Sequence, residues 1–105
     1  MAEALRFFFD AGSGVCLWAG NGEARARYDY AVDHHGLALS APLKERLDEL
    51  IARFDTDFDW NDPGGARLWS EDARAAFAQD ALSALERLRL ELPEPGFVII
   101  DESRL

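Results

Sequence analysis

Two segments of the chain carry apolar side chains at the spacing of an amphipathic helix, and each begins directly after a serine. In the first segment, Ser40 is suited to cap a helix, and Pro42 lies in the first turn, where its missing N–H leaves no hydrogen bond unmade. The apolar stripe that follows consists of Leu43, Leu47, Leu50, Ile51 and Phe54. The pattern predicts a helix over residues 41–54.

The second helical segment follows Ser70, which is again a good cap. Glu71 and Asp72 come next, and their negative charge favours the positive N-terminal end of a helix. The apolar stripe of this segment consists of Phe77, Ala81, Ala84, Leu85, Leu88 and Leu92. Pro93 ends the pattern, because proline cannot continue a helix. We therefore expect two amphipathic helices that bury their stripes against a common core.

The remaining apolar runs are short and lie mostly near the two ends of the chain. Residues 5–10 read Leu-Arg-Phe-Phe-Phe-Asp, which is typical of a strand covered on both faces, and residues 15–18 form a second short run. The Gly-Ser-Gly break between them predicts a β-hairpin. Residues 30–33 add a short extended piece, and residues 97–100 predict a buried strand. Because the first and last strands are the most apolar, we expect them to lie centrally in the sheet and to pair with each other.

Residues 22–28 allow two interpretations. The Asn-Gly pair that begins at Asn21 could form a tight hairpin turn into a third strand, or Asn21 could cap a short helix. The Ala, Glu and Arg residues of this stretch favour the helix. Together, the elements predict a single α+β domain over residues 1–105. In this domain a small sheet, made of the N-terminal β-hairpin and the C-terminal strand, packs against two amphipathic helices.

The charge of the chain limits its partners. Asp and Glu number 20 against 11 Lys and Arg, and the net charge is −9. Proteins that bind the phosphate backbone of nucleic acids need clusters of Lys and Arg. We therefore expect no direct binding of DNA or RNA and no docking on an anionic membrane. A basic protein partner or a cation suits the field of this chain better.

The sequence also indicates where the protein acts. The N-terminal residues lack the basic and apolar regions of a signal peptide, and no apolar run approaches the roughly 20 residues that span a bilayer. Cys16 is the single cysteine, so no internal disulfide can form, which favours a reducing compartment. We therefore expect a cytoplasmic protein.

The acidity is concentrated between the two expected helices. Residues 55–72 contain six acidic residues and one arginine, which amounts to −5 of the total −9, and they also contain Trp60 and Trp69. The alternating aspartates are similar in spacing to a calcium-binding loop, but no register supplies both the glycine at the sixth position and the glutamate at the twelfth. Three interpretations follow: a looser carboxylate site for Ca²⁺ or Mg²⁺, a solvated turn that Phe58 and Trp60 fix to the core, and a surface for docking a protein.

The adjacent histidines and the cysteine are the other candidates for chemistry. His34 and His35 should point in different directions, and a zinc site would need two further ligands, for which no spacing supports Cys16 or Asp33. We expect solvated loop histidines and no metal or cofactor. Cys16 lies in a strand pattern, where a cysteine is usually a small buried hydrophobe. The alternative is a nucleophilic Cys16 with a histidine as its base.

Two acidic stretches carry a resemblance to a known class of proteins. Residues 55–62 with Trp60, and the acidic helix start at residues 69–72, resemble the small acidic immunity proteins that neutralise bacterial polymorphic toxins. The resemblance implies a cytoplasmic inhibitor that binds a secreted toxin domain and blocks its active site.

These observations lead to one main hypothesis and two alternatives. We predict a non-enzymatic protein-binding domain whose acidic and aromatic residues meet a basic cleft on a toxin partner. The residues expected to bind are Asp55, Asp57, Asp59, Trp60, Asp62, Trp69, Glu71 and Asp72. The first alternative is a structural or regulatory domain that forms a homodimer through Leu82, Leu90 or an exposed strand edge. The second is a metal-dependent or hydrolytic enzyme around Cys16, His34, His35 and the aspartate-rich loop.

Overall fold

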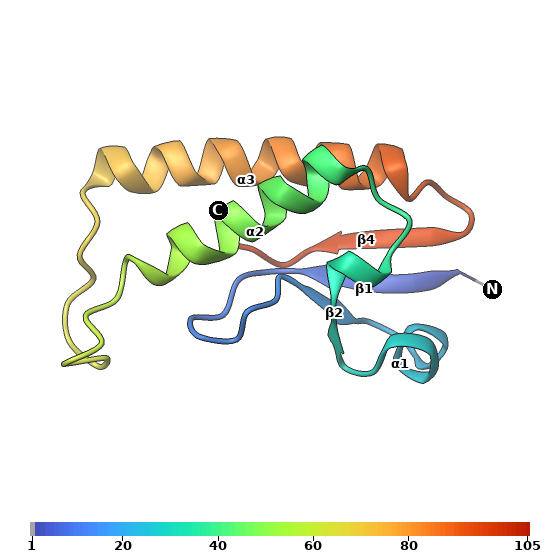
Figure 1. Cartoon of the computed structure of the whole chain (residues 1–105), viewed down its shortest axis with the longest axis horizontal. Coiled ribbons are helices and arrows are strands. Elements are labelled where there is room, and N and C mark those ends of the chain that lie inside the picture. The colour runs from blue at the N-terminus through green and yellow to red at the C-terminus, as the bar shows by residue number, and fades with distance from the viewer. Residues whose placement is uncertain (1) are drawn as a thin grey trace.

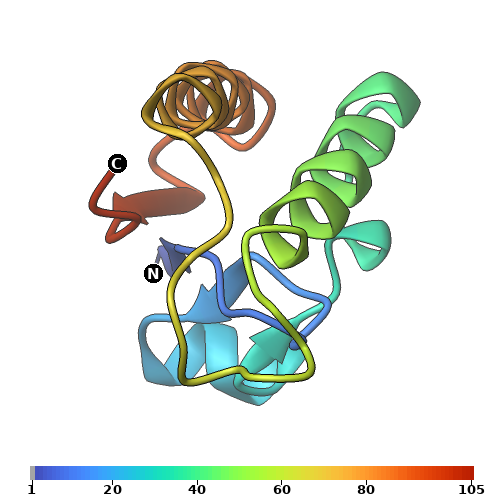
Figure 2. The same ribbon diagram turned by 90° about the vertical axis from the view of Figure 1, so that its left-hand side faces the viewer.

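The two long helices lie on one face of a four-stranded sheet in the computed structural model, which describes residues 2–105 (Figure 1). The elements follow in the order β1 (Glu3–Phe7), β2 (Leu17–Ala19), α1 (Gly22–Tyr28), β3 (Ala31–Val32), η1 (His34–Gly36, a 3-10 helix), α2 (Ala41–Asp55), α3 (Glu71–Glu91) and β4 (Phe97–Asp101). Viewed from its end, α3 lies beside β4, and α2 lies on the side of the molecule that holds η1 (Figure 2). This arrangement confirms the predicted α+β class with two helices packed on a small sheet.

The order of the strands is β3-β2-β1-β4. β1 pairs antiparallel with β2 and parallel with β4, where Leu5 lies opposite Ile99. The predicted pairing of the first and last strands is therefore confirmed, but the expectation that both lie centrally is wrong for β4, which forms an edge. The side chain of Arg89 in α3 covers part of this edge, because its Nη2 donates a hydrogen bond of 2.8 Å to the carbonyl of Ile99.

The run of three phenylalanines divides at the end of β1. Phe7 is fully buried in the core and is the last residue of β1, so the predicted strand over residues 5–10 begins two residues too late and ends three residues too late. Phe8 stacks on Trp18 with ring centroids 4.7 Å apart, whereas Phe9 packs edge-on against Phe77 of α3 at 5.0 Å. Residues 8–16 then connect β1 to β2, and the antiparallel pairing of these consecutive strands confirms the predicted β-hairpin.

The short helix α1 settles the two interpretations of residues 22–28. Asn21 caps this helix, since its Oδ1 accepts a hydrogen bond of 3.0 Å from the backbone N–H of Ala24. The same amide group also accepts from the backbone of Ala4 and donates to the carbonyl of Ala2. A single side chain thus both starts α1 and fixes it to β1.

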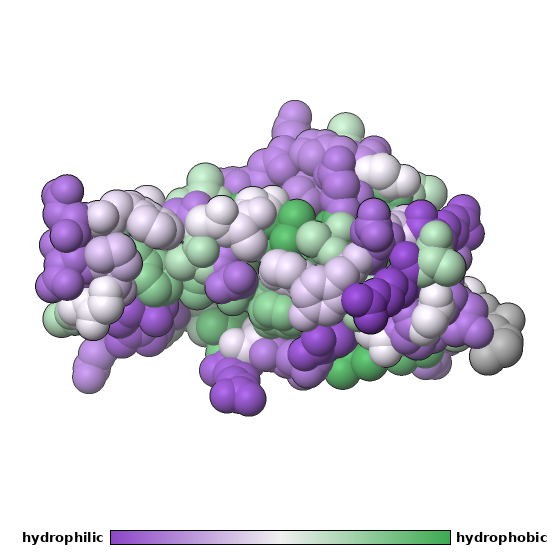
Figure 3. All heavy atoms as spheres, turned by 90° about the horizontal axis from the view of Figure 1, so that it is seen from below, coloured by the Kyte–Doolittle hydropathy of each residue, from purple (hydrophilic) through white to green (hydrophobic). Residues whose placement is uncertain are grey.

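The apolar stripes of α2 and α3 face the core, as their sequences predict, and the strands and connections supply the rest of it. The largest fully buried side chains include Phe7, Phe77, Leu5, Leu17, Leu47, Leu50 and Leu88. Ser40 caps α2 and also links the two helices, because its backbone N–H and its hydroxyl donate to the carboxylate of Glu91 at the end of α3. Figure 3 shows the face seen from below, where hydrophobic residues are interspersed with hydrophilic ones. Among residues 2–105, no helix combines the length and the apolar character needed to cross a bilayer.

Candidate partner-binding segment

The connection between α2 and α3 forms one end of the elongated molecule, which measures 42 × 23 × 23 Å (Figure 1). We refer to residues 55–72 as the acidic–aromatic segment; they comprise the last residue of α2, the connection, and the first two residues of α3. The segment has little regular structure of its own. Its shape is therefore set by backbone turns and by side-chain hydrogen bonds, and a buried carboxylate accepts two of the latter.

Asp57 organises the segment from the inside. Its Oδ1 accepts a hydrogen bond of 2.8 Å from the backbone N–H of Trp69, and its Oδ2 accepts one of 2.8 Å from Nε of Arg67. Nη2 of Arg74 lies 3.6 Å from the same Oδ2. Burial raises the pKa of Asp57, but the hydrogen bonds from Trp69 and Arg67 and the charges of Arg67 and Arg74 outweigh that effect and lower the pKa below its ordinary value.

The burial of Asp57 changes its expected role. The residue is 0% exposed, which contradicts a direct contact between its carboxylate and a partner. Its backbone carbonyl also accepts a hydrogen bond of 2.9 Å from the N–H of Leu68, so both the side chain and the main chain tie the start of the segment to its end. Asp57 therefore holds the segment in one shape, and the surface is formed by its neighbours.

The aromatic residues divide into an inner and an outer set. The guanidinium of Arg67 lies over the ring of Phe58 at 3.9 Å, and Trp69 packs on Phe77 with ring centroids 5.0 Å apart. Trp69 is thus half-buried against the core, and its indole N–H donates to the hydroxyl of Thr56. Trp60 is different, because 55% of it is exposed.

Trp60 is nevertheless held in place. Its indole N–H donates a hydrogen bond of 3.2 Å to the carbonyl of Asp55. Its ring also lies against Gly12 in the connection between β1 and β2, at a position where the backbone φ of +79° favours glycine. The N–H of Gly12 donates in turn to Oδ1 of Asp55 at 3.0 Å. Two loops far apart in the sequence therefore support one exposed indole.

The remaining acidic residues of the segment stay without a basic partner. Within residues 2–105, no ion pair involves Asp55, Asp59, Asp62, Glu71 or Asp72. Asp62, Glu71 and Asp72 are exposed, whereas Asp55 and Asp59 are half-exposed. Since Arg67 is used by the buried Asp57, the outward charge of the segment is negative and uncompensated.

The two histidines correct the expectation in part, because His35 is exposed as predicted, whereas His34 is buried and both rings converge on one carboxylate. His34 is buried, with 3% exposed, and its Nε2 lies 2.7 Å from Oδ1 of Asp48. Nε2 of His35 lies 2.8 Å from the same oxygen. The 3-10 helix η1 explains this geometry, because it turns tightly enough to bring the two rings to centroids 4.4 Å apart.

Asp48 is the residue of this cluster that the sequence does not reveal. It lies on the charged face of α2, where an aspartate is ordinary. Burial raises the pKa of Asp48, but the hydrogen bonds from His35 and His34 lower it by more. The pKa is therefore below its ordinary value. A helical pattern does not show which loop its outer face meets.

Cys16 does not have the surroundings of a nucleophile. It is fully buried, and burial together with the charge of Asp48 raises its pKa to about 12, so the thiol keeps its proton at neutral pH. In the described part of the chain, the hydrogen bonds of both histidine rings go to Asp48 and not to Cys16. The cysteine, the histidines and the aspartate-rich loop therefore do not assemble into one hydrolytic site.

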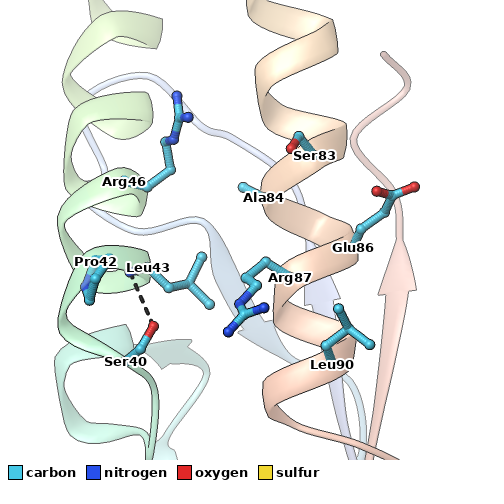
Figure 4. Close-up of a pocket in the computed structure, with 9 residues that line it drawn as sticks. All are labelled: Ser40, Pro42, Leu43, Arg46, Ser83, Ala84, Glu86, Arg87 and Leu90. Atoms are coloured by element: carbon cyan, nitrogen blue, oxygen red, sulfur yellow. Dashed lines mark hydrogen bonds between the residues drawn. The ribbon is translucent and has the colours of Figure 1, made fainter.

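The outer residues of α3 lie beside a groove. Figure 4 shows this hollow of about 520 Å³ between the first turns of α2 and the second half of α3. Leu90, which is 70% exposed, lies on its rim, and Leu82 is 37% exposed. Leu90 and Leu82 are therefore accessible, and self-association through them stays a prediction.

One family of known proteins matches nearly the whole chain. A family model described as Serratia CdiI immunity protein-like matches residues 4–100. No curated protein matches the sequence. The matched range includes the complete sheet except for its outermost residues, all of the helices, and the whole acidic–aromatic segment.

Proposed function

Because the chain belongs to the Serratia CdiI immunity protein-like family, we propose that it is a non-enzymatic inhibitor that binds a basic toxin domain through the acidic–aromatic segment. The observation that supports this surface most directly is that the same segment holds exposed carboxylates without basic partners and an exposed tryptophan. The proposal places the protein in the cytoplasm of the cell that it protects.

Charge and hydrophobic contact would act together at this surface. Exposed charges of one sign speed the encounter with a surface of opposite sign, and they select against partners of like sign. An aromatic side chain that enters a pocket of the partner then supplies much of the binding energy. Asp62 and Asp72 are suited to the first task, and Trp60 is suited to the second.

The internal bonds of the segment support the same function. Ordering a flexible loop on binding lowers affinity, because each immobilised side chain loses conformational entropy. Here Asp57, Arg67 and Gly12 already hold the segment in one shape before a partner arrives. The negative surface would enter a basic cleft in the way that a substrate phosphate backbone would, and so block the cleft.

Charge reversal tests the surface. The partner is sought as the product of the gene directly upstream, and its affinity is measured by calorimetry at low and at high salt. We expect the double variant D62K/D72K to bind at least about tenfold more weakly, which corresponds to about 1.4 kcal/mol, and to lose most of the salt dependence. The matched variant E45K/E86K changes the charge equally at exposed helix positions away from the segment, and it should bind almost normally.

The possible outcomes separate the parts of the proposal. Equal losses for both double variants would show that only the net charge matters, and they would exclude the segment as the binding surface. Binding that neither variant changes would exclude the electrostatic mechanism but leave an inhibitor with another surface. Asp57 is left unchanged in these variants, because its reversal would disrupt the segment from inside.

A further inference from the structure

Three side chains from two elements meet at the junction of η1 and α2. One ring nitrogen each of His34 and His35 and one carboxylate oxygen of Asp48 all lie within 4.8 Å of one another. The Nε2 atoms of both rings lie within 2.8 Å of the same oxygen, Oδ1. The cluster lies outside the acidic–aromatic segment, and the proposed inhibition does not use it.

The geometry of the cluster exceeds what a hydrogen bond alone requires. One carboxylate oxygen satisfies the buried His34, and a second histidine on the same oxygen adds little, since His35 is 52% exposed and water is available to its ring. Ordering the side chain of His35 costs conformational entropy. Convergence of a second imidazole on one point is, in contrast, what a metal ion demands of its ligands.

The backbone holds the two histidines in this position. Asp33 caps η1, and its Oδ1 accepts a hydrogen bond of 2.9 Å from the N–H of His35. The ammonium group of Lys44 in α2 donates to the carbonyl of His35 at 3.0 Å and so braces η1 against the helix. His34 is fixed by burial, and Asp48 is fixed by its place on α2.

The geometry points to a binding site for a divalent transition metal ion, of which Zn²⁺ is the representative, formed by His34, His35 and Asp48. Two imidazoles and one carboxylate are ligands that Zn²⁺ and its neighbours accept, whereas Ca²⁺ and Mg²⁺ prefer oxygen alone. The half-exposed His35 and Asp48 leave a path for the ion and a fourth position for water.

The distances are close to those of a loaded site. Zinc bonds to nitrogen and oxygen are about 2.0–2.2 Å long, so ligand atoms in a tetrahedral site lie about 3.3 Å apart. The observed separations of 2.7 and 2.8 Å from Oδ1 therefore have to widen by about half an ångström. A small rotation of the exposed His35 side chain and of Asp48 provides that room. The bound ion would then link η1, the segment after β3, to α2.

Metal titration of the untagged protein tests the site without a toxin partner. We expect calorimetry with ZnCl₂ to show saturable binding of one ion per chain and a melting temperature that rises with zinc and then levels off. Co²⁺ should bind at the same site and give the visible absorption of a protein-bound ion with nitrogen ligands. A polyhistidine tag has to be removed first, because it would bind either metal.

Two variants connect the binding to the named residues. H35A removes an exposed ligand, and D48N removes the carboxylate charge while it keeps the shape of the side chain. Each should weaken zinc binding by more than the about 10–100-fold that the loss of an outer-shell partner costs. The matched control E45Q removes one charge from the same helix, three residues away, and should bind zinc within about twofold of the unchanged protein.

Either of two results would overturn the site. One is the absence of saturable binding at millimolar ZnCl₂. The other is binding that H35A and D48N leave intact, since such binding would come from the acidic surface and not from this cluster. If D48N unfolds, H35A with its exposed side chain decides alone. Because the toxin partner takes no part in these measurements, their outcome is independent of the proposed inhibition.

Discussion

Two aspartates gather positively charged or hydrogen-bonding side chains along α2, and they do so in opposite ways. Asp57, just beyond the end of the helix, is 0% exposed and is held by Arg67, Arg74 and the backbone of Trp69. Asp48, inside the helix, has a side chain that is 48% exposed and is shared by His34 and His35. Both carboxylates have pKa values below their ordinary value.

The partners of each aspartate decide what it can do. An arginine does not give up its proton in a protein and offers no lone pair to a ligand. Asp57 is therefore a closed centre that serves only the shape of the acidic–aromatic segment. An imidazole can exchange its N–H for a metal ion. Asp48 is therefore an open centre that can take an ion from solvent. Similar hydrogen bonding around a carboxylate thus has a structural use in one place and a ligand-binding use in the other.

The comparison predicts the largest loss of stability at Asp57. D57A leaves the buried N–H of Trp69 and part of Arg67 without an acceptor, and each unsatisfied buried donor costs about 1–3 kcal/mol. Since Arg67 and Arg74 reach solvent, we expect a total loss of about 2–3 kcal/mol in urea unfolding. D48A in metal-free buffer leaves one buried group, the ring of His34, without its partner, while the exposed His35 can turn to water, so it should cost less, about 1–1.5 kcal/mol. Equal losses at both positions would remove the distinction between a closed and an open centre.

Trp60 is the exposed aromatic residue of the segment that Asp57 ties together. If Asp57 serves to present this indole, W60A should weaken toxin binding by about 2 kcal/mol, or roughly thirtyfold, as loss of a hot-spot residue does. Y30A is the matched control, since Tyr30 is 44% exposed but belongs to the strand side of the molecule. Calorimetry measures both affinities, and urea unfolding checks that both variants stay folded. A similar loss for Y30A would move the binding surface away from the segment.

The pH dependence of stability isolates the charge of Asp57. Its pKa in the folded protein is lowered from the ordinary 3.8, so the stabilisation is present above that value and is lost as the pH falls through the folded pKa. D57N cannot titrate and should lack this part of the acid loss. The difference in unfolding free energy between the unchanged protein and D57N should therefore shrink from pH 7 to pH 3, as measured by urea unfolding. A constant difference would show that the charge of Asp57 contributes nothing.

The local features of the fold are readable from the sequence because local rules govern them. Each α-helix begins after a capping residue, Asn21, Ser40 or Ser70, whose side-chain oxygen accepts a hydrogen bond from the backbone N–H three residues later. The apolar stripes of the two long helices face the core, as their spacing in the sequence predicts. The position of β4 at the sheet edge had no such signal. The contact that Arg89 makes with this edge comes from another element, and a local pattern does not predict it.

The candidate sites are less readable, because their carboxylates are distinguished only by distant partners. Asp57 is one of several alternating aspartates in the sequence, and Arg67 and Trp69, which bury it, come ten and twelve residues later. Asp48 is equally hard to recognise in the sequence, since its partners His34 and His35 lie 14 and 13 residues before it. The acidic–aromatic composition indicated a surface, but it could not separate the residue beneath that surface from those on it.

The two arginines at Asp57 provide the finest test of the closed centre. Arg67 makes a 2.8 Å hydrogen bond and covers Phe58, so R67A should cost about 1–1.5 kcal/mol in urea unfolding. Arg74 lies at 3.6 Å with half of its side chain exposed, and an ion pair of this kind contributes little, so R74A should cost less than about 0.5 kcal/mol. The double variant R67A/R74A should then lose little more stability than R67A alone. If R74A costs as much as R67A, the positive charge around Asp57 stabilises the segment, and the direct hydrogen bond from Arg67 does not.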